Sequence, residues 1–104
     1  MFGRGPKTIT IEQLAERLEH GTPVVWDVRE PSEFAEGHVP GAHNVPLATV
    51  VAASAGLDPH AETLLICRSG RRSATAMKRL ARRGFTDVHS VRGGTSAWRG
   101  KLER

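Results

Sequence analysis

The chemistry of this chain centres on Cys67, the one cysteine among its 104 residues. A cysteine thiolate is a strong nucleophile, and nearby cations or backbone N–H groups favour the thiolate over the thiol. The residues that follow Cys67 supply both influences, since they combine arginines with small residues that permit a tight turn: Arg68, Ser69, Gly70, Arg71, Arg72 and Ser73. We therefore predict a reactive cysteine rather than an inert buried one.

The segments on either side of this loop predict how the cysteine is held. Residues 63–66 are typical of a buried strand that ends at Cys67, and a helix is predicted to start near Arg71 or Arg72. Gly70 permits backbone angles that other residues resist. Consecutive N–H groups of such a loop can turn toward the sulfur, and the positive end of the helix points the same way. The loop is thus predicted to form an anion cradle.

The spacing of the arginines bears on which anion the loop binds. Cysteine-dependent phosphatases need an arginine six positions after the nucleophile, and Ser73 stands at that position here. Arg72 comes one residue earlier and gives a smaller loop, which suits a sulfur atom or a small sulfur oxyanion. Sulfur transfer to a thiolate also needs no proton donor at that step, unlike phosphate ester hydrolysis. A phosphatase or arsenate reductase is therefore disfavoured.

The elements that position the loop are predicted from hydrophobic periodicity and from turn residues. Thr10 and Gln13 form a capping box ahead of the first helix, and Gly84 ends the amphipathic helix that follows the loop. Strands alternate with helices, which predicts an α/β domain with a mainly parallel sheet that binds ligands at the carboxyl ends of its strands. The expected helices are 11–20, 31–35, 47–55, one from Arg71 or Arg72 to Arg83, and a short one through 98. The expected strands are 24–28, 43–45, 63–66 and 88–91.

Length and composition indicate one domain over residues 1–104, with a core of about 7–99. No apolar run approaches membrane-spanning length, and residues 1–6 contain no hydrophobic signal region, so we expect a cytoplasmic protein without membrane contact. The formal charge of +4 favours anionic partners. Nucleic acid is not favoured, because no aromatic interleaving accompanies the basic residues. Scattered histidines and the absence of a CxxC motif predict no metal site, and no cofactor is expected.

Several motifs in the same order resemble those of the rhodanese family, from about Lys7 to Trp98. They are 25–30 (VWDVRE), 33–34 (EF), 37–46 (GHVPGAHNVP), 67–73 (CRSGRRS) and 93–94 (GG) with Trp98. The resemblance implies the rhodanese fold, a five-stranded, mostly parallel sheet flanked by helices. It implies that Cys67 becomes a persulfide wrapped by residues 68–73. The side chains of Arg68, Arg71 or Arg72 would then meet an anionic donor.

From this resemblance and the loop we predict a sulfurtransferase of the thiosulfate:cyanide type. Cys67 takes a sulfane sulfur from thiosulfate or a persulfide and passes it to a thiophilic acceptor. This acceptor is expected to be a small molecule or an acceptor protein. A second hypothesis keeps the persulfide but makes the domain a sulfur-relay or interaction module with little turnover. Both use the same residues, and the sequence does not choose between them.

Other polar residues of these motifs have predominantly structural interpretations. Asp27 is expected to cap a nearby loop, and Arg29 to pair with Glu33 or Glu30. The side chains of His38 and His43 are expected to hydrogen-bond within the loop of residues 37–46. Trp26 and Trp98 are expected in the core or beside the site.

Overall fold

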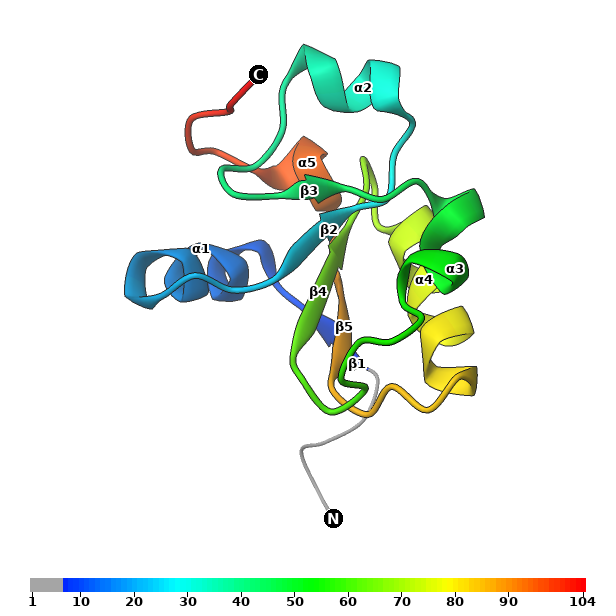
Figure 1. Cartoon of the computed structure of the whole chain (residues 1–104). Helices are drawn as coiled ribbons and strands as arrows, with labels where there is room; N and C mark the ends of the chain where they lie inside the picture. Colours follow the sequence, from blue (N-terminus) through cyan, green and yellow to red (C-terminus); the bar gives the residue numbers. More distant parts are fainter. Residues whose placement is uncertain (1–6) are drawn as a thin grey trace.

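A computed structural model describes residues 7–104, and residues 1–6 lie outside the described part (Figure 1). The strands are β1 (Lys7–Ile9), β2 (Val25–Asp27), β3 (His43–Asn44), β4 (Thr63–Ile66) and β5 (Val88–Val91). The helices are α1 (Ile11–His20), α2 (Pro31–Glu36), the 3₁₀ helix η1 (Leu47–Thr49), α3 (Val50–Ala53), α4 (Arg71–Arg82) and α5 (Gly94–Ala97).

The five strands form one sheet in the order β1-β5-β4-β2-β3, and each neighbouring pair is parallel. The predicted α/β class and parallel sheet are confirmed. Strand β4 lies at the centre, where Leu65 is in register with Trp26 on β2 and with Ser90 on β5. Cys67 directly follows this central strand, so it lies at the carboxyl edge of the sheet, where α/β domains bind ligands.

Helices cover both faces of the sheet, with α1 on one side and α3 and α4 on the other (Figure 1). Side chains of a strand alternate between faces, and β4 divides its residues accordingly. Leu65 and Cys67 belong to the apolar cluster that includes Leu80 of α4. Leu64 and Ile66 belong to the cluster that includes Leu14 of α1. The reactive cysteine therefore points to the side of the sheet that α4 covers.

The first helix has the predicted bounds, and its start is fixed by the predicted capping box. The Gln13 amide donates to the Thr10 hydroxyl at 3.0 Å, and the Thr10 amide donates to Gln13 Oε1 at 2.7 Å. Helix α4 also follows the prediction, with its first residue at Arg71. Within residues 7–104, no helix has the length and hydropathy needed to cross a membrane.

The structure departs from the predicted elements at strand β1, which the residue pattern did not predict, and between residues 47 and 55. The expected single helix is divided into η1 and the one-turn α3. Its beginning is tied to the sheet rather than to a helical turn, because the Leu47 amide donates to the Val28 carbonyl at 3.0 Å. The Thr49 amide then donates to the Pro46 carbonyl at 2.8 Å, which closes a tighter 3₁₀ turn. Hydrogen bonds to the strand thus override the helical pattern.

Candidate active site

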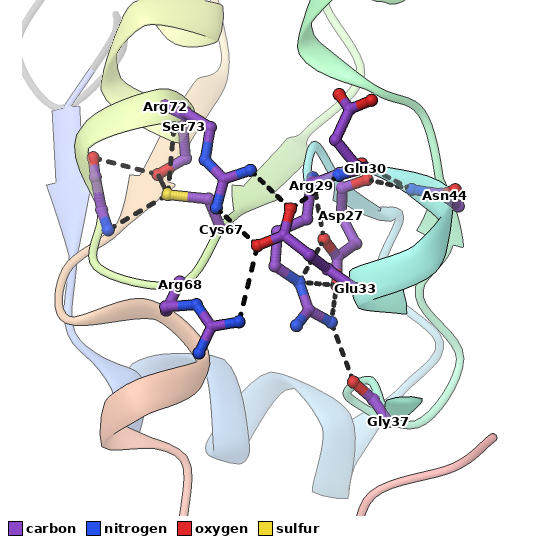
Figure 2. A network of polar contacts seen from close by, with 11 residues as sticks. Asp27, Arg29, Glu30, Glu33, Gly37, Asn44, Cys67, Arg68, Arg72 and Ser73 are labelled. Carbon is purple, nitrogen blue, oxygen red and sulfur yellow. Dashed lines mark hydrogen bonds and ion pairs between the residues drawn. The ribbon is translucent and has the colours of Figure 1, made fainter. Parts of the chain in front are cut away.

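The sulfur of Cys67 is enclosed by its own loop, and the residue is 1% exposed. Its Sγ accepts hydrogen bonds from the backbone amides of Gly70 at 3.1 Å and Ser73 at 3.4 Å (Figure 2). These two amides come from the last loop residue and from the first turn of α4. The geometry is that of the predicted cradle, in which a strand end and a helix start direct N–H groups at one sulfur.

The loop keeps this shape because its carbonyl groups are held from the opposite side by α5. The Cys67 and Arg68 carbonyls accept from the amides of Thr95 at 2.8 Å and Ser96 at 3.0 Å. Gly94 makes this approach possible, since a Cβ there would overlap both carbonyl groups. Gly70 has a φ of 100°, in the left-handed region that favours glycine. Because the loop carbonyls point toward α5, the amides of Gly70 and Ser73 can point toward the sulfur.

Hydrogen bonding lowers the pKa of the Cys67 thiol below its ordinary value. Burial is the largest single influence and acts in the opposite direction, because it disfavours a charged sulfur. The amide and hydroxyl of Ser73, together with the amides of Gly70 and Ser69, outweigh it. The loop therefore raises the fraction of thiolate available for nucleophilic attack at neutral pH.

Two buried hydroxyls lie behind the sulfur. Ser73 Oγ is 3.7 Å from Cys67 Sγ, donates to the Gly70 carbonyl at 3.2 Å, and is 2.7 Å from the Oγ of Ser90. Ser73 was predicted as part of the loop, whereas Ser90, in the middle of β5, was missed. In the sequence, Ser90 is recognisable as a hydroxyl residue within a strand that is expected to be buried. This position alone does not indicate that Ser73 is its partner.

The outer side of the loop carries charge, and a carboxylate from α2 binds its arginines (Figure 2). Glu33 forms a two-pronged pair with Arg72, at 2.7 Å and 3.0 Å, and its Oε2 lies 3.5 Å from Arg68 Nη2. The Glu30 amide donates to Glu33 Oε1 at 2.9 Å. The Arg72 hydrogen bond is the main cause that lowers the pKa of Glu33 to about 2. Glu33 is therefore ionised at neutral pH and joins α2 to the loop.

The predicted pairing of Arg29 with Glu33 or Glu30 is wrong. Arg29 binds Asp27 instead, through Nε at 2.9 Å and Nη2 at 2.8 Å, and Nη2 also donates to the Gly37 carbonyl at 2.8 Å. Asp27 Oδ1 accepts from the Arg29 amide at 3.1 Å, so Asp27 does cap a nearby turn as expected. Both side chains are buried, and the pair links the end of β2 to Gly37, the residue that follows α2.

The remaining predicted residues differ in exposure. Arg68, Ser69 and Arg71 are exposed, and the structure gives Arg71 no side-chain partner among residues 7–104.

The Nδ1 atom of His38 is 2.9 Å from the Phe34 carbonyl, and its ring stacks on Phe34. Its partner thus lies in α2 rather than in the loop of residues 37–46, contrary to the prediction.

Trp26 is buried in the cluster on the α4 side, as expected for a core residue. Trp98 packs partly buried against the opposite cluster.

One group of side chains has the composition of a metal site, but it lies at the other edge of the sheet. Among the described residues, Glu62, Asp87 and His89 bring their ligand atoms within 4.8 Å of one another near the amino ends of β4 and β5. These atoms already have partners. Arg17 Nε donates to both Glu62 oxygens at 3.1 Å and 3.2 Å, and His89 Nε2 is 2.6 Å from Asp87 Oδ1. Within the described residues, the buried Nδ1 of His89 has no hydrogen-bond partner, and the group is separate from the Cys67 loop.

The fold and the loop define a class of α/β domain in which a buried cysteine follows the central parallel strand and accepts amides from the next helix. Residues 10–101 match the family model of the Rhodanese-like domain, and the chain belongs to this family. The predicted family resemblance is thereby confirmed.

Relatives of the chain have named functions or solved structures. It is 39% identical over 93 residues to thiosulfate sulfurtransferase GlpE of Pseudomonas putida strain F1, covering 89% of this chain and 84% of that protein. Identity to GlpE of Pseudomonas aeruginosa strain PAO1 is 35% over 91 residues, covering 88% and 82%. A crystal structure of a Rhodanese-like domain protein from Staphylococcus aureus has a TM-score of 0.82 and 33% identity, covering 93% of this chain and 96% of that one. At the family level, sulfur transfer or sulfur relay is supported.

Proposed function

We propose that this chain is a sulfurtransferase in which Cys67 carries a sulfane sulfur as a persulfide. The observation that carries the proposal is the position of Cys67 Sγ, which accepts amides from Gly70 and Ser73 at the carboxyl edge of the sheet. These donors favour the thiolate and remain close to any negative charge that develops on an attached sulfur. The naming of relatives as thiosulfate sulfurtransferases supports thiosulfate as a donor.

The reaction proceeds in two displacements at sulfur. The Cys67 thiolate attacks the outer sulfur of thiosulfate, a new S–S bond forms, and sulfite leaves with the electron pair of the old S–S bond. An acceptor such as cyanide then attacks the outer sulfur of the persulfide. Thiocyanate departs, and the electron pair of the broken S–S bond regenerates the thiolate. Neither step needs a proton donor, which agrees with a loop that contains no carboxylic acid.

The rim of the loop is proposed to receive the anionic donor. Arg71 is exposed, Arg68 has a 59% exposed side chain, and Arg72 is 35% exposed. Cationic groups at these positions attract small sulfur oxyanions and persulfides, and they would equally attract an acidic surface on an acceptor protein. Because Glu33 already binds two of these arginines, a donor has to share or replace that internal carboxylate.

A steady-state assay with thiosulfate and cyanide tests the proposal. The account predicts thiocyanate formation with parallel double-reciprocal lines, the pattern of a ping-pong mechanism, and no activity in Cys67→Ser. Transfer by Cys67→Ser at the parental rate would contradict it. A stable persulfide without thiocyanate would assign the chain to sulfur relay. Hydrolysis of an aryl phosphate without a persulfide would support phosphatase chemistry, which Ser73 at the position of the required arginine disfavours.

A further inference from the structure

We infer that Ser90 is a positioning residue that holds the Ser73 hydroxyl in the orientation needed to donate to the Cys67 thiolate. Ser90 lies on β5, is 2% exposed, and places its Oγ 2.7 Å from Ser73 Oγ. Among the residues that the structure describes, the hydrogen bonds of the sulfur are with Gly70 and Ser73 and not with Ser90. Its effect on Cys67 therefore passes through Ser73.

The inference follows from counting protons around Ser73 Oγ. This hydroxyl has one proton and three polar neighbours, namely Cys67 Sγ at 3.7 Å, the Gly70 carbonyl at 3.2 Å and Ser90 Oγ at 2.7 Å. When Cys67 is a thiol, its S–H donates to Ser73, whose own proton goes to the Gly70 carbonyl or to Ser90. When Cys67 is a thiolate, the sulfur can only accept, and Ser73 has to turn its proton toward it.

Ser90 makes that second arrangement favourable. Once the Ser73 proton points to the sulfur, Ser73 Oγ has its lone pairs free, and Ser90 is the neighbour able to donate to it. A hydroxyl that accepts one hydrogen bond donates a stronger one, so donation by Ser90 strengthens the Ser73 bond to the thiolate. As Cys67 ionises, Ser73 thus turns its proton from the Gly70 carbonyl to the sulfur, while Ser90 donates to Ser73. The Gly70 carbonyl keeps its hydrogen bond from the Ala74 amide.

A purely structural role explains the position less well. Val88 and Val91 on the same strand are fully buried, and the neighbouring cluster on the α4 side is apolar. Alanine would fill this site without burying a hydroxyl, which is costly unless it is hydrogen-bonded. The partner of Ser90 is the Ser73 hydroxyl, which also contacts the nucleophile.

The test measures the rate of Cys67 alkylation by iodoacetamide as a function of pH. In Ser90→Ala, the midpoint is expected to rise by about half a pH unit, the size of shift that loss of one modest hydrogen bond produces. Ser90→Thr restores a hydroxyl and is expected to return the midpoint toward the parental value. Ser54→Ala is the matched control, since Ser54 is also buried but donates to the Val51 carbonyl, away from the sulfur.

An unchanged midpoint in Ser90→Ala would overturn the inference, as would equal shifts in Ser90→Ala and Ser54→Ala. Circular dichroism of each variant establishes that the compared proteins are folded. Should Ser90→Ala fail to fold, the isosteric pair Ser90→Thr and Ser90→Val decides: a higher midpoint in Ser90→Val than in Ser90→Thr supports the inference, and equal midpoints overturn it. Alkylation requires no sulfur donor, so the result is independent of the proposed sulfurtransferase activity.

Discussion

The sulfur of Cys67 lies between two regions of different character. The inner wall consists of the Gly70 and Ser73 amides and the hydroxyls of Ser73 and Ser90, and it is buried and carries no formal charge. The outer rim consists of Arg68, Arg72 and Glu33, and it is charged and partly exposed. Figure 2 shows Glu33 reaching the rim from α2.

The difference separates two tasks of the loop around Cys67, namely ionisation of the thiol and binding of an anion. The hydrogen-bond donors of the inner wall stabilise the thiolate directly and lower the pKa of Cys67, so the inner wall governs ionisation of the thiol. Paired charges at the rim remain exchangeable because solvent screens them, so we propose that the rim governs binding of an anionic donor. Variants of the two regions should therefore change different quantities.

The largest expected effect is loss of donor binding in Arg72→Ala. Removal of a hydrogen-bonded charge is expected to raise the KM for thiosulfate by roughly tenfold to a hundredfold, since such a bond contributes about 1.5–3 kcal/mol. The variant also leaves Glu33 without its main partner near the entering anion. The KM for anionic thiosulfate and the rate of Cys67 alkylation by neutral iodoacetamide provide the comparison. Arg82→Ala, at the exposed end of the same helix, is the control, and equal losses with both reagents would contradict the assigned role of Arg72.

Next in size is the effect of Ser73→Ala on ionisation of the thiol. The substitution removes the hydroxyl and keeps the amide that donates to Sγ at 3.4 Å. The alkylation midpoint of Cys67 is expected to rise by about one pH unit, more than in Ser90→Ala, because Ser73 contacts the sulfur directly. The KM of the fully ionised enzyme for thiosulfate should change little. A changed KM with an unchanged midpoint would reverse the division between inner wall and rim.

A smaller effect of opposite sign is expected from Glu33→Gln. Glutamine still accepts the Glu30 amide but no longer neutralises Arg68 and Arg72, so thiosulfate should bind better. Because partly exposed ion pairs contribute up to about 1 kcal/mol, the KM is expected to fall about threefold. Glu62→Gln is the matched control, since Glu62 also pairs with an arginine but near the amino ends of the strands. A raised KM would mean that Glu33 orients Arg72 more than it competes with the donor.

The smallest effect concerns acid stability. The pKa of Glu33 is lowered from 4.5 to about 2, so its ion pair stabilises the fold above about 4.5, and that contribution is lost as the pH falls toward 2. Urea unfolding across this window should show a steeper loss of stability in the parent protein than in Glu33→Gln, by about 1 kcal/mol or less after solvent screening. Identical pH dependences would show that the pair adds nothing to folding.

Local features of this fold were predictable from the sequence, and contacts between distant segments were not. The capping box at Thr10 and the strand that ends at Cys67 depend on neighbouring residues, and both were predicted correctly. The pairing of Glu33 with Arg72 joins residues 39 positions apart, and the pairing of Ser73 with Ser90 joins residues 17 apart. Nothing in the spacing of these residues indicates which partner each will meet.

The error at Arg29 has a related cause. Arg29 was expected to pair with Glu33 or Glu30, but residues 27–29 form a turn in which the Arg29 side chain folds back on Asp27, two positions earlier. With Arg29 held there, Glu33 is left to the arginines of the loop. The wrong pairing of Arg29 therefore concealed that Glu33 binds the predicted arginines of the loop.

The most direct test of the account is the intact mass of the reduced protein after incubation with thiosulfate and removal of the excess. The account predicts the addition of one sulfur atom, located on the peptide that contains Cys67 and released by cyanide as thiocyanate. Cys67→Ser should gain no sulfur under the same conditions. If the parent protein remained unmodified, or if Cys67→Ser gained the same mass, Cys67 would not be the sulfur carrier.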